Sequence, residues 1–228
     1  LFEISLPRVQ VLVAGGTGAL EIKSGYGLTL SDELKMLRVI KRIKAQVDIP
    51  IKTTFLAAHA LPEEFRSNKQ GFIQVVVDQW IPKVISEGLA DYIDLFCETG
   101  YFDAVDIELI AQAIQGTHIK LKVHVNQFNS IGGVPLCTEL ESLTIDHLEI
   151  LNDQDINAIK KSNTMPVALP NCSFFLNIPY TPARKIMDNN IPLAIASDYN
   201  PGSSPSGNMN FVVSLACTKM GMSPEEAI

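Results

Sequence analysis

Three histidines and one aspartate stand at positions in this sequence where they could bind a metal ion together. His59, His124 and His147 each come at or near the end of an apolar, strand-like segment, and Asp198 ends a further one. Imidazole nitrogens and a carboxylate oxygen form a good ligand set for Zn²⁺ or Fe²⁺. Because independent turns do not explain four such residues on four strands, the pattern favours a catalytic metal centre.

Each of these residues also has a simpler interpretation. A lone histidine is more often a packing residue, and an aspartate before Asn-Pro-Gly is more often a turn residue. His118 begins a strand instead of ending one, so we expect a surface or packing role for it. If His59 and His147 contact substrate, only His124 and Asp198 remain for the metal, and further ligands must come from a strand outside this sequence.

Strands alternate with helices along the chain. Strands are predicted at residues 19–24, 50–59, 92–98, 118–126, 143–148, 166–171 and 192–198. Helices are predicted at residues 31–47 with Ser31 as N-cap, at 103–114, and at 181–188 with Thr181 as N-cap. This alternation predicts parallel βα units, at a spacing near the roughly 30 residues per unit of a (β/α)8 TIM-type barrel.

Seven units are one fewer than a barrel needs. Residues 1–16 are predicted to form a helix that runs into a glycine pair, so the missing strand should lie upstream, and Ser223 is predicted to cap a helix at the other end. We therefore expect a fragment of a longer protein. A doubly wound sheet is the alternative, but GGTG at residues 15–18 precedes a strand, and no GxGxxG follows one.

Composition narrows the class of protein. With 228 residues, 46% of them hydrophobic, one domain is the default, and a net charge of −7 argues against nucleic acid or anionic membrane as the main partner. No apolar run approaches the roughly 18 residues that span a bilayer. The four cysteines form no CxxC pair, so reduced, mostly buried thiols in a cytoplasmic protein are predicted.

Five segments resemble the imidazolonepropionase family of the amidohydrolase superfamily. They are LEIKSGYGL (20–28), TTFLAAHALP (53–62), KVHVNQFNSIGG (122–133), DHLE (146–149) and SDYNPGSSP (197–205). The resemblance covers essentially the whole chain. It implies that residues 1–228 are barrel strands two to eight of the catalytic domain, without the first strand, its His-x-His metal pair and a small terminal β-domain.

The resemblance also implies roles for individual residues. His124 and Asp198 would bind one Zn²⁺ or Fe ion per chain, and Asp198 would also move protons. His147 would assist catalysis, and Gln127 would hydrogen-bond the substrate ring and take part in turnover. Substrate-binding residues would include a further set: Tyr26, His59, Asn200, Gly202 and Ser203.

The implied reaction is hydrolysis of the cyclic amide of 4-imidazolone-5-propanoate to N-formimidoyl-L-glutamate, in histidine degradation. A cytosine- or guanine-type deaminase and a non-catalytic truncated remnant are the alternatives, and a homodimer is left open. The chain departs from the family at Asn126, where the family has aspartate. Two residues beyond His124 on a strand, Asn126 is expected to face the same way and to hydrogen-bond near the metal.

Overall fold

The structure is a computed structural model that describes all of residues 1–228. Its contacts divide the chain into two compact units. The first unit contains residues 1–10 and 18–122, and the second contains residues 11–17 and 123–228. Helix α1 (Phe2–Ala14) and strand β4 (Lys120–Val125) each contribute residues to both units.

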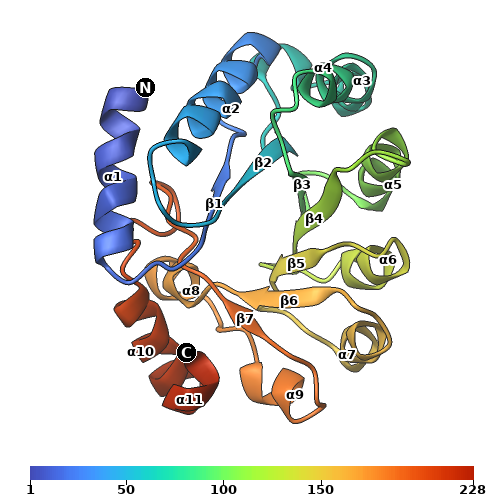
Figure 1. Cartoon of the computed structure of the whole chain (residues 1–228). Coiled ribbons are helices and arrows are strands. Elements are labelled where there is room, and N and C mark those ends of the chain that lie inside the picture. The colour runs from blue at the N-terminus through green and yellow to red at the C-terminus, as the bar shows by residue number, and fades with distance from the viewer. The chain divides into compact units, whose positions relative to one another are not determined.

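The first unit is a parallel sheet with helices on its outer side (Figure 1). Strand β1 pairs with β2, and β2 with β3, in parallel register, so that Leu20 lies opposite Ile51 and Thr54 opposite Tyr92. The elements are β1 (Leu20–Lys23), α2 (Leu30–Lys44), β2 (Ile51–Ala58), η1 (Glu63–Phe65), α3 (Lys69–Val75), η2 (Val76–Trp80), α4 (Ile81–Ser86), β3 (Tyr92–Cys97) and α5 (Ala104–Ala113).

The second unit repeats this arrangement. Strand β5 pairs with β6, and β6 with β7, again in parallel. Its elements are α6 (Gly133–Glu139), β5 (Thr144–His147), α7 (Asp153–Lys160), β6 (Met165–Ala168), α8 (Pro170–Leu176), α9 (Ala183–Met187), β7 (Ala194–Ile195), α10 (Met209–Met220) and α11 (Pro224–Ala227).

Burial explains why these segments form these elements. In β2 only Lys52 is exposed, the pattern of a strand in a parallel sheet with both faces covered. Helix α2 buries Leu34, Leu37, Ile40 and Ile43, an apolar stripe at helical spacing, and thereby packs onto the sheet. The predicted order of alternating strands and helices is confirmed.

Several predicted boundaries are wrong. Helix α2 is capped by Thr29, whose side chain accepts a hydrogen bond from Asp32 N, so Ser31 lies inside the helix. Helix α9 begins after Pro182, and Thr181 does not cap it. Strand β7 is only two residues long, so Asp198 lies beyond the strand instead of ending it. The predicted cap at Ser223 is confirmed, and its side chain accepts a hydrogen bond from Glu226 N.

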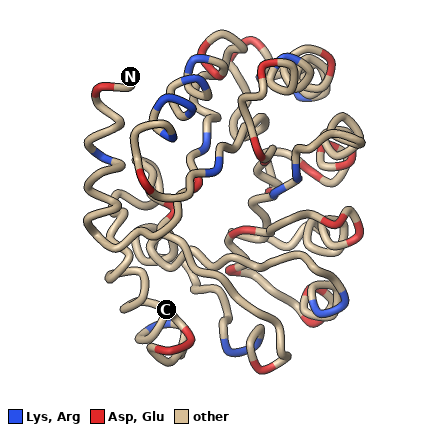
Figure 2. The backbone as a smooth tube through the Cα atoms, in the orientation of Figure 1, with Lys and Arg blue, Asp and Glu red and all other residues tan.

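Charged residues of both signs lie along the helices of each unit (Figure 2). A partly buried group of ion pairs links the strands of the first unit, since Lys23 Nζ lies 2.6 Å from Asp94 Oδ2 and Lys122 Nζ lies 2.6 Å from Glu21 Oε2. The four cysteines are not joined in disulfides, and three of them are buried, as predicted. No helix combines the length and the apolar composition that crossing a membrane requires.

Candidate functional site

In the first unit, Tyr26 and His59 lie against each other. Tyr26 is 54% exposed on the loop after β1, and His59 directly follows β2. Their ring centroids are 5.1 Å apart, and His59 also lies 6.3 Å from the ring of Phe96 at the end of β3. Strand ends of a parallel sheet therefore bring together the two residues predicted to bind substrate in this unit.

The loop that carries Tyr26 is held by a buried carboxylate that the sequence analysis missed. Glu33, in the first turn of α2, accepts hydrogen bonds from Gly25 N at 2.8 Å, Gly27 N at 2.6 Å and Leu28 N at 3.3 Å. A side chain at Gly27 would place its Cβ 2.7 Å from Glu33 N, so the close approach requires glycine. An acidic residue in the first turn of a helix, directly after a glycine-rich loop, was the available signal.

In the second unit, the structure brings His124 and His147 together. Their ring centroids are 5.3 Å apart, and both residues are buried. His147 is the last residue of β5 and has φ +87°, and Leu148 follows with φ +65°. The Thr181 hydroxyl donates to the His147 carbonyl at 2.6 Å. Two successive positive φ values outside glycine store backbone strain, which is typical of functional sites.

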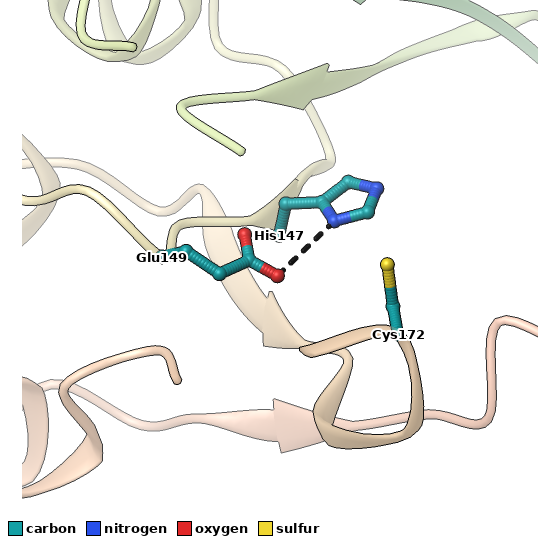
Figure 3. Close-up of side chains that lie close together, drawn as sticks. All are labelled: His147, Glu149 and Cys172. Atoms are coloured by element: carbon teal, nitrogen blue, oxygen red, sulfur yellow. Dashed lines mark hydrogen bonds and ion pairs between the residues drawn. The ribbon is translucent and has the colours of Figure 1, made fainter. Parts of the chain in front are cut away.

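His147 belongs to a buried cluster with Glu149 and Cys172 (Figure 3). Its Nδ1 lies 3.3 Å from Glu149 Oε1, which also accepts a hydrogen bond from Ser173 Oγ at 3.2 Å. The Gln127 amide donates to Cys172 Sγ at 3.3 Å. Glu149 and Cys172 were also missed, although Glu149 follows His147 by two residues in the DHLE segment.

Electrostatics ties Asp198 to the same cluster. Burial by itself lowers the pKa of His147, but the negative charge of Glu149, hydrogen bonds with Cys172 and Glu149, and the negative charge of Asp198 together raise this pKa well above its usual value. The imidazole is therefore favoured in its protonated form by the carboxylates around it.

The segment after β7 is organised by Asn200. Its side-chain Oδ1 accepts hydrogen bonds from Gly202 N at 2.9 Å and Ser203 N at 2.8 Å, and its Nδ2 donates to the Asp198 carbonyl at 2.6 Å. The Ser203 hydroxyl donates to Asp198 Oδ2 at 3.1 Å. Asn200, Gly202 and Ser203 thus hold Asp198, which has φ +51°, in place.

Asn126 does not lie where the strand pattern placed it. Strand β4 ends at Val125, and Asn126 has φ +57°, a left-handed conformation that asparagine tolerates better than most residues. Its Nδ2 donates to the Ile150 carbonyl at 2.8 Å and to Asp155 Oδ2 at 3.2 Å. The amide therefore joins the end of β4 to the first turn of α7, and the expectation that it follows the strand direction of His124 is wrong.

We expect Asn126→Asp to destabilise the fold by about 1–3 kcal/mol at about pH 7, because the donor is lost and a carboxylate faces Asp155. Burial already raises the pKa of Asp155 despite its hydrogen bonds, so the folded state holds that proton more tightly than the unfolded chain does. Stability therefore rises as pH falls toward this pKa, and the loss in Asn126→Asp should shrink.

Urea unfolding at about pH 7 and about pH 5 measures this effect. The exposed Asn157 on the same helix, α7, gives the matched control, since Asn157→Asp should change stability by less than about 0.5 kcal/mol. A loss in Asn126→Asp that is independent of pH would contradict the charge repulsion.

The remaining histidine, His118, is exposed, which agrees with the surface role, one of the two predicted for it. The His118 ring lies with Nε2 3.3 Å from the Ala90 carbonyl, just before β4.

Comparison with known proteins finds close relatives along the whole chain. No family model matches. Proteins named imidazolonepropionase from Christiangramia forsetii and Flavobacterium johnsoniae are 57% and 54% identical to it over 228 residues. Another from Thermoanaerobacter pseudethanolicus is 36% identical over 228 residues. These matches cover 100% of this chain but 55–56% of each relative, so the chain spans little more than half the length of the curated relatives it matches.

Solved structures show the fold. A 5-methylcytosine deaminase from Klebsiella pneumoniae, liganded with 5-fluorocytosine, matches with a TM-score of 0.72 at 12% identity, over 97% of this chain and 59% of the deaminase. An atrazine chlorohydrolase from Arthrobacter aurescens, complexed with zinc, matches with a TM-score of 0.71 at 14% identity, over 99% of this chain and 55% of that enzyme. The predicted α/β fold, a fragment of a (β/α)8 TIM-type barrel, is confirmed.

Proposed function

We infer that this chain, which belongs with the imidazolonepropionases by homology over all of its 228 residues, is part of an enzyme that hydrolyses 4-imidazolone-5-propanoate to N-formimidoyl-L-glutamate. The observation that carries the proposal is the identity of 36–57% along the whole chain. The deaminase and chlorohydrolase structures share the fold at only 12–14% identity, so they do not favour their own reactions.

A metal ion fits the donor groups of the second unit. The His124 imidazole and the Asp198 carboxylate offer nitrogen and oxygen, the ligand types that Zn²⁺ and Fe²⁺ accept. His124 lies against His147, and Asp198 acts electrostatically on the same imidazole, which supports one shared centre. When bound, such an ion would lower the pKa of water to about 7 and polarise a carbonyl. We propose that an upstream His-x-His completes the ligand set.

The chain's own residues would divide the chemistry among them. Asp198 would accept a proton from the attacking water and pass it to the leaving ring nitrogen, as a general base and then a general acid. His147 would stabilise the negative charge that develops on the carbonyl oxygen. Its Nδ1 faces Glu149, and its Nε2 points away from that carboxylate (Figure 3), so Nε2 is the nitrogen that we assign to the substrate.

The remaining residues would bind and orient the substrate. Gln127 would hydrogen-bond the imidazolone ring. Tyr26 and His59, whose ring centroids are 5.1 Å apart, are also proposed to bind substrate. Asn200 and the N–H groups of Gly202 and Ser203 would bind the propanoate group of the substrate. Both N–H groups already donate to Asn200 Oδ1. To bind the substrate carboxylate, they would have to release Asn200 Oδ1 and donate to the carboxylate instead.

The decisive experiment uses a protein extended to the length of the curated relatives. We expect about one Zn²⁺ or Fe ion per chain by elemental analysis, and hydrolysis of imidazolonepropanoate. Deamination of cytosine or guanine without imidazolone hydrolysis would overturn the proposed substrate. If a folded, metal-loaded protein showed neither activity, this result would favour a non-catalytic remnant. Gel filtration on the same preparation tests the homodimer.

We predict that Gln127→Ala keeps the metal but loses turnover, because Gln127 contacts Cys172 and is assigned to the ring instead of the ion. A buried hydrogen bond to substrate that is lost should lower kcat/KM by roughly 10–100-fold, or about 1.4–2.8 kcal/mol. Steady-state kinetics and elemental analysis measure the two effects. Unchanged turnover would contradict the role, and loss of metal would show that Gln127 belongs to the ion's surroundings.

A further inference from the structure

The cluster of His147, Glu149 and Cys172 offers three different metal-binding atoms at short range (Figure 3). One ring nitrogen, one carboxylate oxygen and the thiol sulfur all lie within 4.8 Å of one another, and all three residues are buried. The residues come from the end of β5, the turn after it and the first turns of α8, so the fold and not the local sequence assembles them.

If the cluster served only to orient His147, one of its polar atoms would have no role. Glu149 Oε1 meets His147 Nδ1 and the Ser173 hydroxyl, but Glu149 Oε2 is buried without a hydrogen-bond partner. A buried carboxylate oxygen without a donor costs free energy, since it has left water and gained nothing in exchange. A cation bound by this carboxylate, through Oε1 alone or through both oxygens, would place a positive charge beside Oε2.

We propose that His147, Glu149 and Cys172 form a binding site for a soft divalent cation such as Zn²⁺ or Cd²⁺, separate from the ligand pair His124 and Asp198. The site would be inhibitory, a consequence that rests on the proposed function. A cation on Nδ1 displaces the ring proton and breaks the hydrogen bond to Glu149, so Nε2 no longer belongs to a protonated imidazole that Glu149 orients toward the substrate.

The geometry suits such an ion. Ligands about 2.0–2.2 Å from zinc in a tetrahedral arrangement lie about 3.3–3.5 Å apart, and His147 Nδ1 and Glu149 Oε1 are 3.3 Å apart. Cys172 Sγ lies within 4.8 Å of the ligand atoms of His147 and Glu149, and the sulfur would approach them when the ion binds. The Gln127 amide, which already contacts Cys172 Sγ at 3.3 Å, or a water could supply the fourth ligand.

Charge balance favours the same class of ion. Binding M²⁺ releases two protons to water, the thiol proton of Cys172 and the ring proton on His147 Nδ1. A bond from sulfur and a bond from Nδ1 to the metal take their place, and no electron is transferred. A thiolate and a carboxylate then neutralise the dication inside the protein, where unbalanced charge is costly. A thiolate ligand selects soft cations, so Mg²⁺ and Ca²⁺, which prefer oxygen ligands, should not compete.

The binding test uses the 228-residue chain and Cd²⁺ as the probe. Titration under reducing conditions should produce one thiolate-to-cadmium charge-transfer band per chain in the ultraviolet, and excess Mg²⁺ should not remove it. Cys172→Ser should abolish the band, whereas the control Cys217→Ser, in α10, should keep it. Glu149→Gln, which keeps the side-chain shape, should weaken Cd²⁺ binding by about 10–100-fold. A full band in Cys172→Ser, or no band in the unaltered chain, would overturn the site.

The inhibition test uses the extended enzyme with its own metal in place. Each variant's rate with excess Cd²⁺ is divided by its rate without it. This ratio should fall at least tenfold in the unaltered enzyme and in Cys217→Ser, and stay near one in Cys172→Ser. Equal inhibition of Cys172→Ser would overturn the inhibitory role. A Cys172-dependent band without any turnover would overturn the proposed function alone, whereas normal turnover without the band would overturn only this site.

Discussion

Replacing Asp198 with asparagine is expected to lower kcat of the extended enzyme by about 10²–10⁴-fold, the range that one general acid–base group contributes. Asparagine keeps the shape of the side chain and an oxygen that can accept the Ser203 hydroxyl, so the loop should keep its conformation. It cannot take up the proton of the attacking water, because an amide is not basic. The loss should therefore appear in kcat more than in KM.

Steady-state kinetics and elemental analysis of the same protein samples separate chemistry from metal binding. The matched control is Asp188→Asn, since Asp188 is 66% exposed in its ion pair with Arg184 at the end of α9, away from the cluster around His147. It should leave kcat within about twofold, in line with the small effects of surface substitutions. A normal rate in Asp198→Asn would rule out the proton-transfer role.

Alanine variants test the ligand assignment itself. Both His124→Ala and Asp198→Ala should lose most of the bound metal, because each removes one of the proposed ligands of the ion. Full metal occupancy in both variants would refute this pair as ligands. Loss in one variant only would show which of the two binds the ion.

Replacing Glu33 with alanine is expected to destabilise the chain by about 2–4 kcal/mol. The carboxylate accepts three backbone N–H groups, and Gly25 and Gly27 provide the two shorter bonds. Hydrogen bonds to a charged group are worth about 1.5–3 kcal/mol, and donors left without an acceptor cost more free energy than donors that regain water. If the loop opens to solvent in Glu33→Ala, its N–H groups regain hydrogen bonds to water. The lost stability should therefore not exceed about 4 kcal/mol.

Denaturant unfolding measures the loss, and hydrogen exchange locates it. The amides of Gly25, Gly27 and Leu28 should exchange much faster in Glu33→Ala, while amides in β2 should respond only through global stability. The exposed Glu108 on α5 gives the control, and Glu108→Ala should stay within about 0.5 kcal/mol. Unchanged exchange at the three loop amides would contradict the role of Glu33.

The same variant links the loop to binding. Because Tyr26 lies between Gly25 and Gly27, a loose loop should raise KM of the extended enzyme more than it lowers kcat. The KM of Glu33→Gln should lie between the values for the unaltered enzyme and for Glu33→Ala. In this variant one side-chain oxygen still accepts hydrogen bonds, but the new NH2 group faces backbone donors. A large fall in kcat at constant KM would assign Glu33 to the chemistry instead.

Local patterns predicted the order of the elements well. Apolar runs such as Ile51–Ala58 and the stripe on α2 depend on burial alone, and periodicity records burial directly. Caps and strand ends were less accurate. Thr29 and Ser31 are both good N-cap residues, and the choice depends on which of them has extended backbone where the chain leaves the β1 loop.

The sequence by itself determined the type of fold, the resemblance on which the function rests, and the candidate donors His124, His147 and Asp198, because each of these depends on residue type and spacing along one chain. Only the tertiary structure decided which atoms meet. It turned Asn126 toward Ile150 and Asp155, placed Glu33 under the Tyr26 loop, and joined β5 to α8 through Glu149 and Cys172. Such contacts depend on positive φ values and on helix placement, which no local pattern records.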